Sequence, residues 1–127
     1  MAVQFKMVPK QNNLVAPPVL KYYTCAVSKD ELHLEDLARI ISSRSTMSRA
    51  DCYGVIMALS EVIGDALANG SIVKVDSLGT FQLVLQGTPA ETEDVLGKSN
   101  IKSAKISYKP SKDLKNKLKR ITYKRMR

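Results

Sequence analysis

The hydrophobic pattern of this chain changes its period at Gly70, and this change limits the folds that the chain can adopt. Before Gly70, apolar residues recur at helical spacing over residues 34–44 and 49–69, with a short turn between them. After it, apolar and polar residues alternate, as they do in strands with one buried face. The alternating segments are 71–76, 80–85 and 101–108. The pattern predicts an α+β fold, in which a helical hairpin packs on a three-stranded antiparallel β-sheet.

Local signals mark the ends of the predicted helices. His33 stands in the cap position before the first helix, and Ser48 with Asp51 matches a capping box at the start of the second. Gly70 suits the left-handed conformation that commonly follows a helix. A last, basic helix is predicted over residues 110–118, because proline is favoured in the first turn. The residues that we expect to point inward from the strands and from this last helix are Val73, Val75, Phe81, Leu83, Leu85, Ala104, Ile106, Tyr108, Leu114 and Leu118.

Further strands are predicted at both ends of the sequence. Residues 2–8 alternate between apolar and polar side chains, and residues 21–27 are rich in Tyr, Thr and Val. Residues 121–124 predict a short terminal strand, and we expect it to pair with one of the N-terminal strands. Residues 86–100 are polar and predict either a long mobile loop or a protruding β-arm.

Composition excludes several classes of protein. With 127 residues, 44% hydrophobic and 25% charged, the chain fits one globular domain. It contains no apolar run long enough for a membrane span, and residues 1–10 lack the apolar core of a secretory signal, so we expect a cytoplasmic protein. Cys25, Cys52 and the single histidine, His33, form no ligand-spaced or catalytic group. We therefore expect no enzyme activity, no catalytic residue, no metal, no cofactor and no small-molecule substrate.

The charge is concentrated in the last quarter of the chain. The formal net charge is +8, but residues 98–127 hold twelve basic residues and one acid, a net +11, whereas the first 97 residues carry −3. Such a field favours a polyanion, because each phosphate that is neutralised releases a counterion. A lysine-rich face that serves solubility alone remains open. An acidic membrane is the weaker option, because the basic segment lacks a face of Trp, Phe and Leu.

Two motifs give the sequence a resemblance to a known family. Residues 70–81, GSIVKVDSLGTF, and residues 106–115, ISYKPSKDLK, follow the order of strands, tight turn and basic helix described above. Over residues 32–118 the chain resembles the HU/IHF family of bacterial histone-like DNA-binding proteins. The segment from Pro17 to Tyr23, PPVLKYY, is similar to one found in a divergent HU-related branch of Bacteroides-type bacteria.

The resemblance implies an intertwined homodimer whose β-arms enter the DNA minor groove, where a proline at each tip wedges between base pairs. The corresponding segment here departs from that pattern. Residues 86–100 contain no arginine, and their only proline, Pro89, comes too early to match the tip. Glu91, Glu93 and Asp94 would repel phosphate. The proline wedge is therefore not carried over, and contacts with the phosphate backbone remain.

The sequence thus predicts a single HU-like DNA-binding domain over residues 1–127. Within it we expect an N-terminal strand extension at 1–30, an HU-like core at 32–118 with the arm or loop at 86–100, and a basic strand or tail at 119–127. Phe81 and Tyr108 are expected in the core rather than as stacking platforms for bases.

The predicted function is largely sequence-independent binding of double-stranded DNA by a homodimeric protein of the cytoplasmic nucleoid. The residues expected to contact DNA are Lys98, Lys102, Lys105, Lys109, Lys112, Lys115, Lys119, Arg120, Lys124 and Arg125. Two alternatives stay open. One is a structural or protein-interaction module on an HU-like fold that has lost DNA bending, and the other is an RNA-binding protein.

Overall fold

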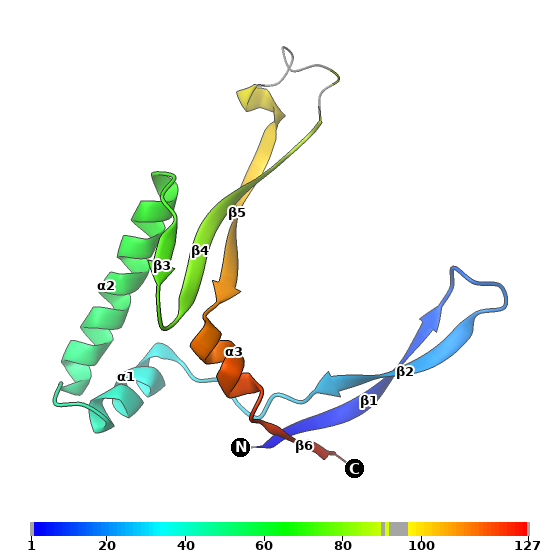
Figure 1. The fold of residues 1–127 in the computed structure, drawn as a ribbon, viewed down its shortest axis with the longest axis horizontal. Helices are drawn as coiled ribbons and strands as arrows, with labels where there is room; N and C mark the ends of the chain where they lie inside the picture. Colours follow the sequence, from blue (N-terminus) through cyan, green and yellow to red (C-terminus); the bar gives the residue numbers. More distant parts are fainter. Residues whose placement is uncertain (1, 90, 92–96, 127) are drawn as a thin grey trace. The chain divides into compact units, whose positions relative to one another are not determined.

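The computed structural model describes residues 2–89, 91 and 97–126, and within them the chain forms two compact units (Figure 1). The central unit comprises residues 33–116. The terminal unit comprises residues 1–32 together with residues 117–127. Each unit is described by itself below.

The central unit begins with the predicted helical hairpin. Helix α1 (Leu34–Ser43) packs on helix α2 (Arg49–Ala68). His33 is the cap residue of α1, and its backbone N–H donates to the Asp36 carboxylate at 2.9 Å. The Ser48 hydroxyl caps α2 by accepting from the Asp51 N–H at 3.1 Å. After α2 the chain reverses through Gly70, whose φ of 85° lies in the left-handed region as predicted.

Three strands follow in one antiparallel sheet of order β3-β4-β5. They are β3 (Val73–Val75), β4 (Gly79–Gly87) and β5 (Ile101–Pro110). A 3₁₀ turn, η2 (Lys98–Asn100), precedes β5, and helix α3 (Lys112–Leu118) follows it. The α+β fold predicted from the sequence is confirmed. The paired ends of β4 and β5 form a hairpin arm, while part of the predicted arm, including Glu93 and Asp94, lies outside the described residues.

The inward-pointing face of this sheet is covered in its inner part but not in its outer part. Phe81 and Leu83 are half-buried, but Leu85 and Ile106 are 56% and 64% exposed. The reason is that α2 contacts β3 and β4, whereas the longer β4–β5 hairpin continues past the short strand β3 (Figure 1). Tyr108 is also exposed, although its ring centroid lies 5.0 Å from that of Phe81. Leu118, expected to face inward from α3, is 62% exposed.

The terminal unit is a second three-stranded sheet, of order β2-β1-β6. Strand β1 (Ala2–Asn12) pairs antiparallel with β2 (Val19–Ala26), and β6 (Thr122–Arg125) pairs with β1 in parallel. The predicted pairing of the last strand with an N-terminal strand is therefore confirmed. Strand β1 is longer than predicted, because residues up to Asn12 pair with β2. Pro9 fits this strand because over residues 6–12 β1 has a neighbour on one side only.

Candidate nucleic-acid interface

One face of the central sheet gathers lysine side chains from two strands. Lys74 on β3 pairs with Thr80 on β4, and Thr80 pairs with Lys109 on β5. Paired residues point to the same side of a sheet, and side chains two residues apart do so as well. Lys105 therefore shares this side with Lys109. We call Lys74, Lys105 and Lys109 the central basic face.

The remaining side chains of this face are polar and uncharged, with one valine. Thr80, Gln82 and Val84 on β4 alternate with the half-buried Phe81 and Leu83 of the opposite face. Ser107 pairs with Gln82. No acidic residue occurs on β3, β4 or β5. Hydroxyl and amide groups between lysines are suited to hydrogen bonds with phosphate and sugar oxygens.

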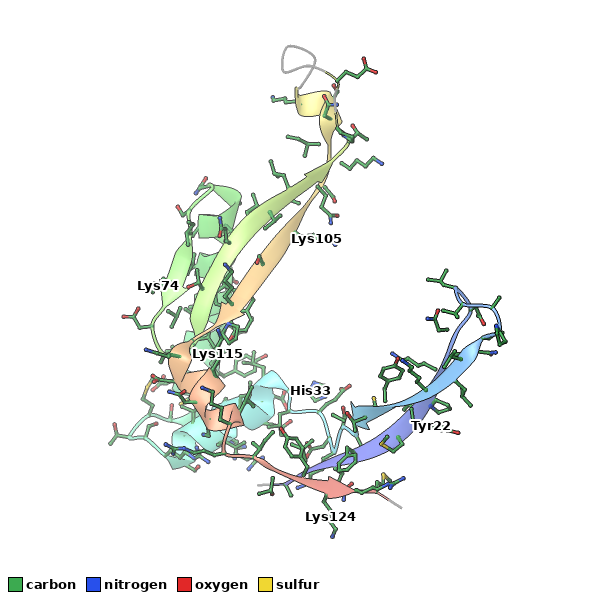
Figure 2. All side chains as sticks on the ribbon, turned by 45° about the vertical axis from the view of Figure 1, so that its right-hand side comes forward. Tyr22, His33, Lys74, Lys105, Lys115 and Lys124 are labelled. Carbon is green, nitrogen blue, oxygen red and sulfur yellow. The ribbon has the colours of Figure 1, made fainter. Side chains whose placement is uncertain are left out.

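The central basic face is left free of counter-charges within the described residues. Within the described residues an ion pair joins Arg39 to Asp36 at 3.8 Å on α1, away from these three lysines. Lys74, Lys105 and Lys109 are all exposed. Figure 2 marks Lys74 and Lys105 on their strands. An anion in solution can therefore approach these ammonium groups directly.

The turn between β3 and β4 fixes the junction that carries Lys109 and the start of α3. The Leu78 carbonyl accepts from the Tyr108 hydroxyl at 2.8 Å and from the Ser111 N–H at 3.1 Å. The Ser111 hydroxyl donates to the Ser77 carbonyl at 2.8 Å and accepts from the Leu114 N–H at 3.2 Å. Ser111 is buried and serves as the cap of α3. The turn thus sets where α3 begins relative to the sheet.

Gly79 allows this close packing. Its φ of 145° is one that L-residues with a side chain rarely adopt. A Cβ at this position would overlap the Lys109 carbonyl oxygen and would come within 2.8 Å of the Tyr108 ring. The glycine of the Gly-Thr-Phe motif therefore lets β4 approach β5 where Lys109 is held.

Helix α3 carries two more of the predicted residues. Lys112 and Lys115 are exposed and lie three residues apart, so they are neighbours on the helix surface. Leu114, which lies between them in the sequence, is half-buried, as predicted. Figure 2 marks Lys115 on this helix.

The ten predicted residues are distributed over several elements and both units. Lys102 has no partner on β4, because the register shifts between Gln86 and Gly87, and at three residues from Lys105 it would not share the side of Lys105 by alternation. Lys98 belongs to η2 rather than to a strand. The other four predicted residues belong to the terminal unit. They are Lys119, Arg120, Lys124 and Arg125.

Sequence reasoning missed Lys74. The predicted DNA contacts all come from residues 98–127, where the positive charge is concentrated, and Lys74 lies outside this range. The signal was present in the alternation, since Val73 and Val75 were assigned to the inner face and Lys74 therefore had to point outward. Its pairing across β4 to Lys109 becomes visible only with the sheet order.

The site offers no set of metal ligands. In the residues that the structure describes, no group of three or more His, Cys, Asp or Glu side chains could hold a metal ion. Cys25 is exposed and Cys52 is buried, and both are free thiols. No helix in the described ranges is long and apolar enough to cross a membrane.

The helical hairpin, the antiparallel sheet with its extended arm, and the helix that follows define an HU-like fold. The chain matches a protein-family model over residues 1–125, and it belongs to that family, HU-HIG, described as an HU domain fused to wHTH, Ig, or glycine-rich motif. This match includes both units.

One solved structure with the same fold is a chain from Bacteroides vulgatus, described as a "putative bacterial DNA binding protein". The two share 16% sequence identity and superpose with a TM-score of 0.70. The match covers 99% of the present chain and 50% of the other, so this chain spans about half the length of that relative. No protein of curated function matches the sequence.

Proposed function

We propose that this chain binds double-stranded DNA through its phosphate backbone, without enzymatic activity and largely without sequence preference. The observation that carries the proposal is the central basic face, three exposed lysines on a sheet that holds no acidic residue. Lysine ammonium groups suit phosphate contacts, whereas base recognition usually relies on Arg, Asn or Gln placed in a groove. The HU domain of the family and the description of the Bacteroides vulgatus relative support DNA as the ligand.

The proposed contacts extend beyond the central basic face. Lys112 and Lys115 would add charge from α3, and Lys98 and Lys102 would do so at the base of the arm. The terminal unit would contribute Lys119, Arg120, Lys124 and Arg125. In this proposal residues 1–127 act as one DNA-binding domain of a bacterial nucleoid protein, from the HU-related branch of Bacteroides-type bacteria.

We further propose that the chain acts as a homodimer. The helical hairpin leaves apolar side chains uncovered in the single chain, at exposures from 40% to 62%. They are Leu37, Ile41, Val55, Leu59 and Val62. Apart from its chain neighbours and the nearby backbone of α2 itself, no atom of the described residues lies within 4 Å of a Cβ built on Gly54 or Gly64, so α2 has room for a close approach at both positions. A patch of this kind usually marks an interface.

The proposal is tested by titrating random-sequence duplex DNA against the full chain over a series of salt concentrations. Changing Lys74, Lys105 and Lys109 to Gln should weaken binding to all sequences alike. It should also reduce the slope of log affinity against log salt by about 2 to 3, since each phosphate contact contributes about 0.9. The matched control changes Arg39, Arg44 and Arg49 to Gln, which removes three positive charges from the helical hairpin.

Three results would overturn the proposal. The first is absence of binding at low salt. The second is an equal loss of affinity in the control variant, which would show that the effect depends on net charge alone. The third is a clear preference for RNA in direct competition, which would favour the RNA-binding alternative. Recovery of protein partners after nuclease treatment, with no affinity for DNA, would favour a protein-interaction module.

A further inference from the structure

The terminal sheet has two faces of different chemistry. The register pairs Val3 with Tyr123, Phe5 with Ala26 and Met7 with Thr24, which places mainly apolar side chains on one face. Arg125, which pairs with Phe5 on its other side, is the basic residue of this face. This face has a hollow of about 500 Å³ lined by Val3, Phe5, Thr24, Ala26 and Tyr123. The alternate residues of the same strands must point to the other side.

The opposite face carries four lysines. Lys6 and Lys10 alternate with the apolar residues of β1, Lys10 pairs with Lys21 on β2, and Lys124 pairs with Gln4 through β6. We call Lys6, Lys10, Lys21 and Lys124 the terminal basic face. All four are exposed, and none of the residues of β1, β2 or β6 is acidic. Figure 2 marks Lys124 on β6.

The side chains around these lysines are polar, aromatic or valine. The face contains, by alternation and pairing, Gln4, Val8, Asn12, Val19, Tyr23 and Cys25. The Lys10 ammonium nitrogen lies 5.6 Å from the centroid of the Tyr23 ring, which places both side chains on the same side of the sheet. A shallow hollow borders Lys10, Lys21 and Tyr23. Tyr23 is about half exposed.

Lys10 and Lys21, which are directly paired, lower the stability of the terminal sheet when no ligand is bound. Like charges on directly paired residues of antiparallel strands destabilise the pairing. The Lys10 contact with Tyr23 compensates part of this repulsion. No carboxylate on the three strands neutralises the rest. An anion that bound from outside would therefore relieve the remaining repulsion.

We propose that the terminal basic face is a second contact surface for the phosphate backbone of duplex DNA. This inference rests on the proposed function, because it assigns another surface to the same ligand. Lys6 and Lys10 are four residues apart on β1, about 13 Å at about 3.3 Å per residue, and Lys124 lies further along, opposite Gln4. The lysines thus follow a line of roughly 20 Å, which suits an extended chain of phosphates better than a single anion.

Charge and composition favour DNA over a lipid surface. Membrane-binding faces combine basic residues with Trp, Phe or Leu that enter the lipid. Here the large apolar residues Phe5, Met7 and Leu20 lie on the other face of the sheet. Amide side chains such as those of Gln4 and Asn12 are suited to hydrogen bonds with phosphate and sugar.

The first experiment compares two double variants of the full chain, each of which lowers the net charge by two. One changes Lys6 and Lys21 to Gln on the terminal basic face. The control changes Gln11 to Glu, on the opposite face of β1, and Lys29 to Gln, outside the strands. The proposal expects the first variant to lose about 2 from the salt slope of duplex binding, and the control to keep the wild-type slope. Equal slopes for the two variants would overturn it.

The second experiment uses the two native cysteines. Cys25 is exposed on the terminal basic face, paired with Lys6, whereas Cys52 is 2% exposed within the central unit. The rate of alkylation of each thiol by the neutral reagent iodoacetamide is followed by mass spectrometry. Saturating duplex should slow alkylation of Cys25 several-fold. Cys52 should stay unreactive throughout, which shows that the chain remains folded.

The outcomes separate the two proposals. If wild-type protein does not bind duplex at all, the proposed function fails. If it binds but Cys25 reacts at the same rate with and without duplex, the proposed function stands and the present inference is overturned. Protection of Cys25 by phosphatidylserine vesicles or by RNA, but not by duplex DNA, would also overturn it.

Discussion

At the scale of single residues, Gly79 connects the conformation of a turn with the placement of a lysine. Its positive φ and the lack of space for a Cβ have the same origin, the close approach of β4 to the end of β5. Leu78, one residue earlier, accepts hydrogen bonds from Tyr108 and Ser111, on either side of Lys109. The position of Lys109 therefore depends on the turn as much as on its own strand.

Changing Gly79 to Ala should lower the free energy of unfolding by at least about 2 kcal/mol, because the new Cβ adds backbone strain and a steric overlap. Urea unfolding followed by circular dichroism measures this change. Gly97→Ala is the matched control, because its φ of −166° is ordinary extended backbone and a Cβ there meets nothing within 4 Å. An equally stable Gly79→Ala protein would contradict the packing described for this turn.

Other residue-scale predictions could be made from sequence because they depend on neighbours along the chain. The Ser48 cap and the left-handed Gly70 are both local features, and both are confirmed. The role of Ser111 could not be predicted, because its hydroxyl bonds to Ser77, which is 34 positions away in the sequence.

At the scale of elements, strand alternation in both sheets places the lysines on one face and most large apolar side chains on the other. In the central sheet the lysines are spread over β3 and β5 with uncharged β4 between them. In the terminal sheet Lys10 and Lys21 face each other on adjacent strands. The terminal sheet therefore carries the stronger internal repulsion.

Replacing Lys21 with Gln should consequently stabilise the free protein. We expect a gain of about 0.2–1 kcal/mol at low salt, because one of two directly opposed charges is removed while the contact of Lys10 with Tyr23 is retained. Thermal unfolding at 20 mM and 500 mM salt measures it, and the gain should shrink at high salt through screening. Loss of stability at low salt would show that the opposed lysines do not repel each other.

Sequence patterns predicted the type of the α-helices and strands in the described chain, but not the 3₁₀ turn η2 and not how well each element is covered. Leu85 and Ile106 follow the alternation of a buried face and yet remain exposed in the single chain. Alternation reports the side to which a residue points, whereas burial depends on whether another layer lies over it. The terminal basic face was missed for a related reason, because Lys6, Lys10 and Lys21 are scattered in the sequence and meet only through pairing.

At the scale of the whole molecule, the small core of the single chain is the main feature. The hydrophobic residues classed as buried in the described chain are Ala38, Cys52 and Leu67. A chain of this length normally buries far more apolar side chains. In the proposed dimer, the exposed apolar residues of α1 and α2 would pack against a second copy.

A homodimer should therefore have a mass of twice 14.1 kDa in light scattering after gel filtration. Changing Val55 and Val62 to Glu should shift the protein to the mass of a single chain, because two carboxylates would have to be buried without partners. The pair Gln82→Glu and Ser107→Glu on the central sheet, where Gln82 is exposed and Ser107 is half-buried, is the charge-matched control and should leave the mass unchanged. A wild-type protein that is monomeric at tens of micromolar would contradict the proposed dimer.

The parallel pairing of β6 with β1 also orders events during synthesis. Residues 2–12 and 19–26 leave the ribosome before the strand that completes their sheet, Thr122–Arg125, and they can form their hairpin locally. The free edge of Ala2–Phe5 must wait until the whole central unit, residues 33–116, has emerged. Premature termination would leave this edge open to pairing with other nascent chains.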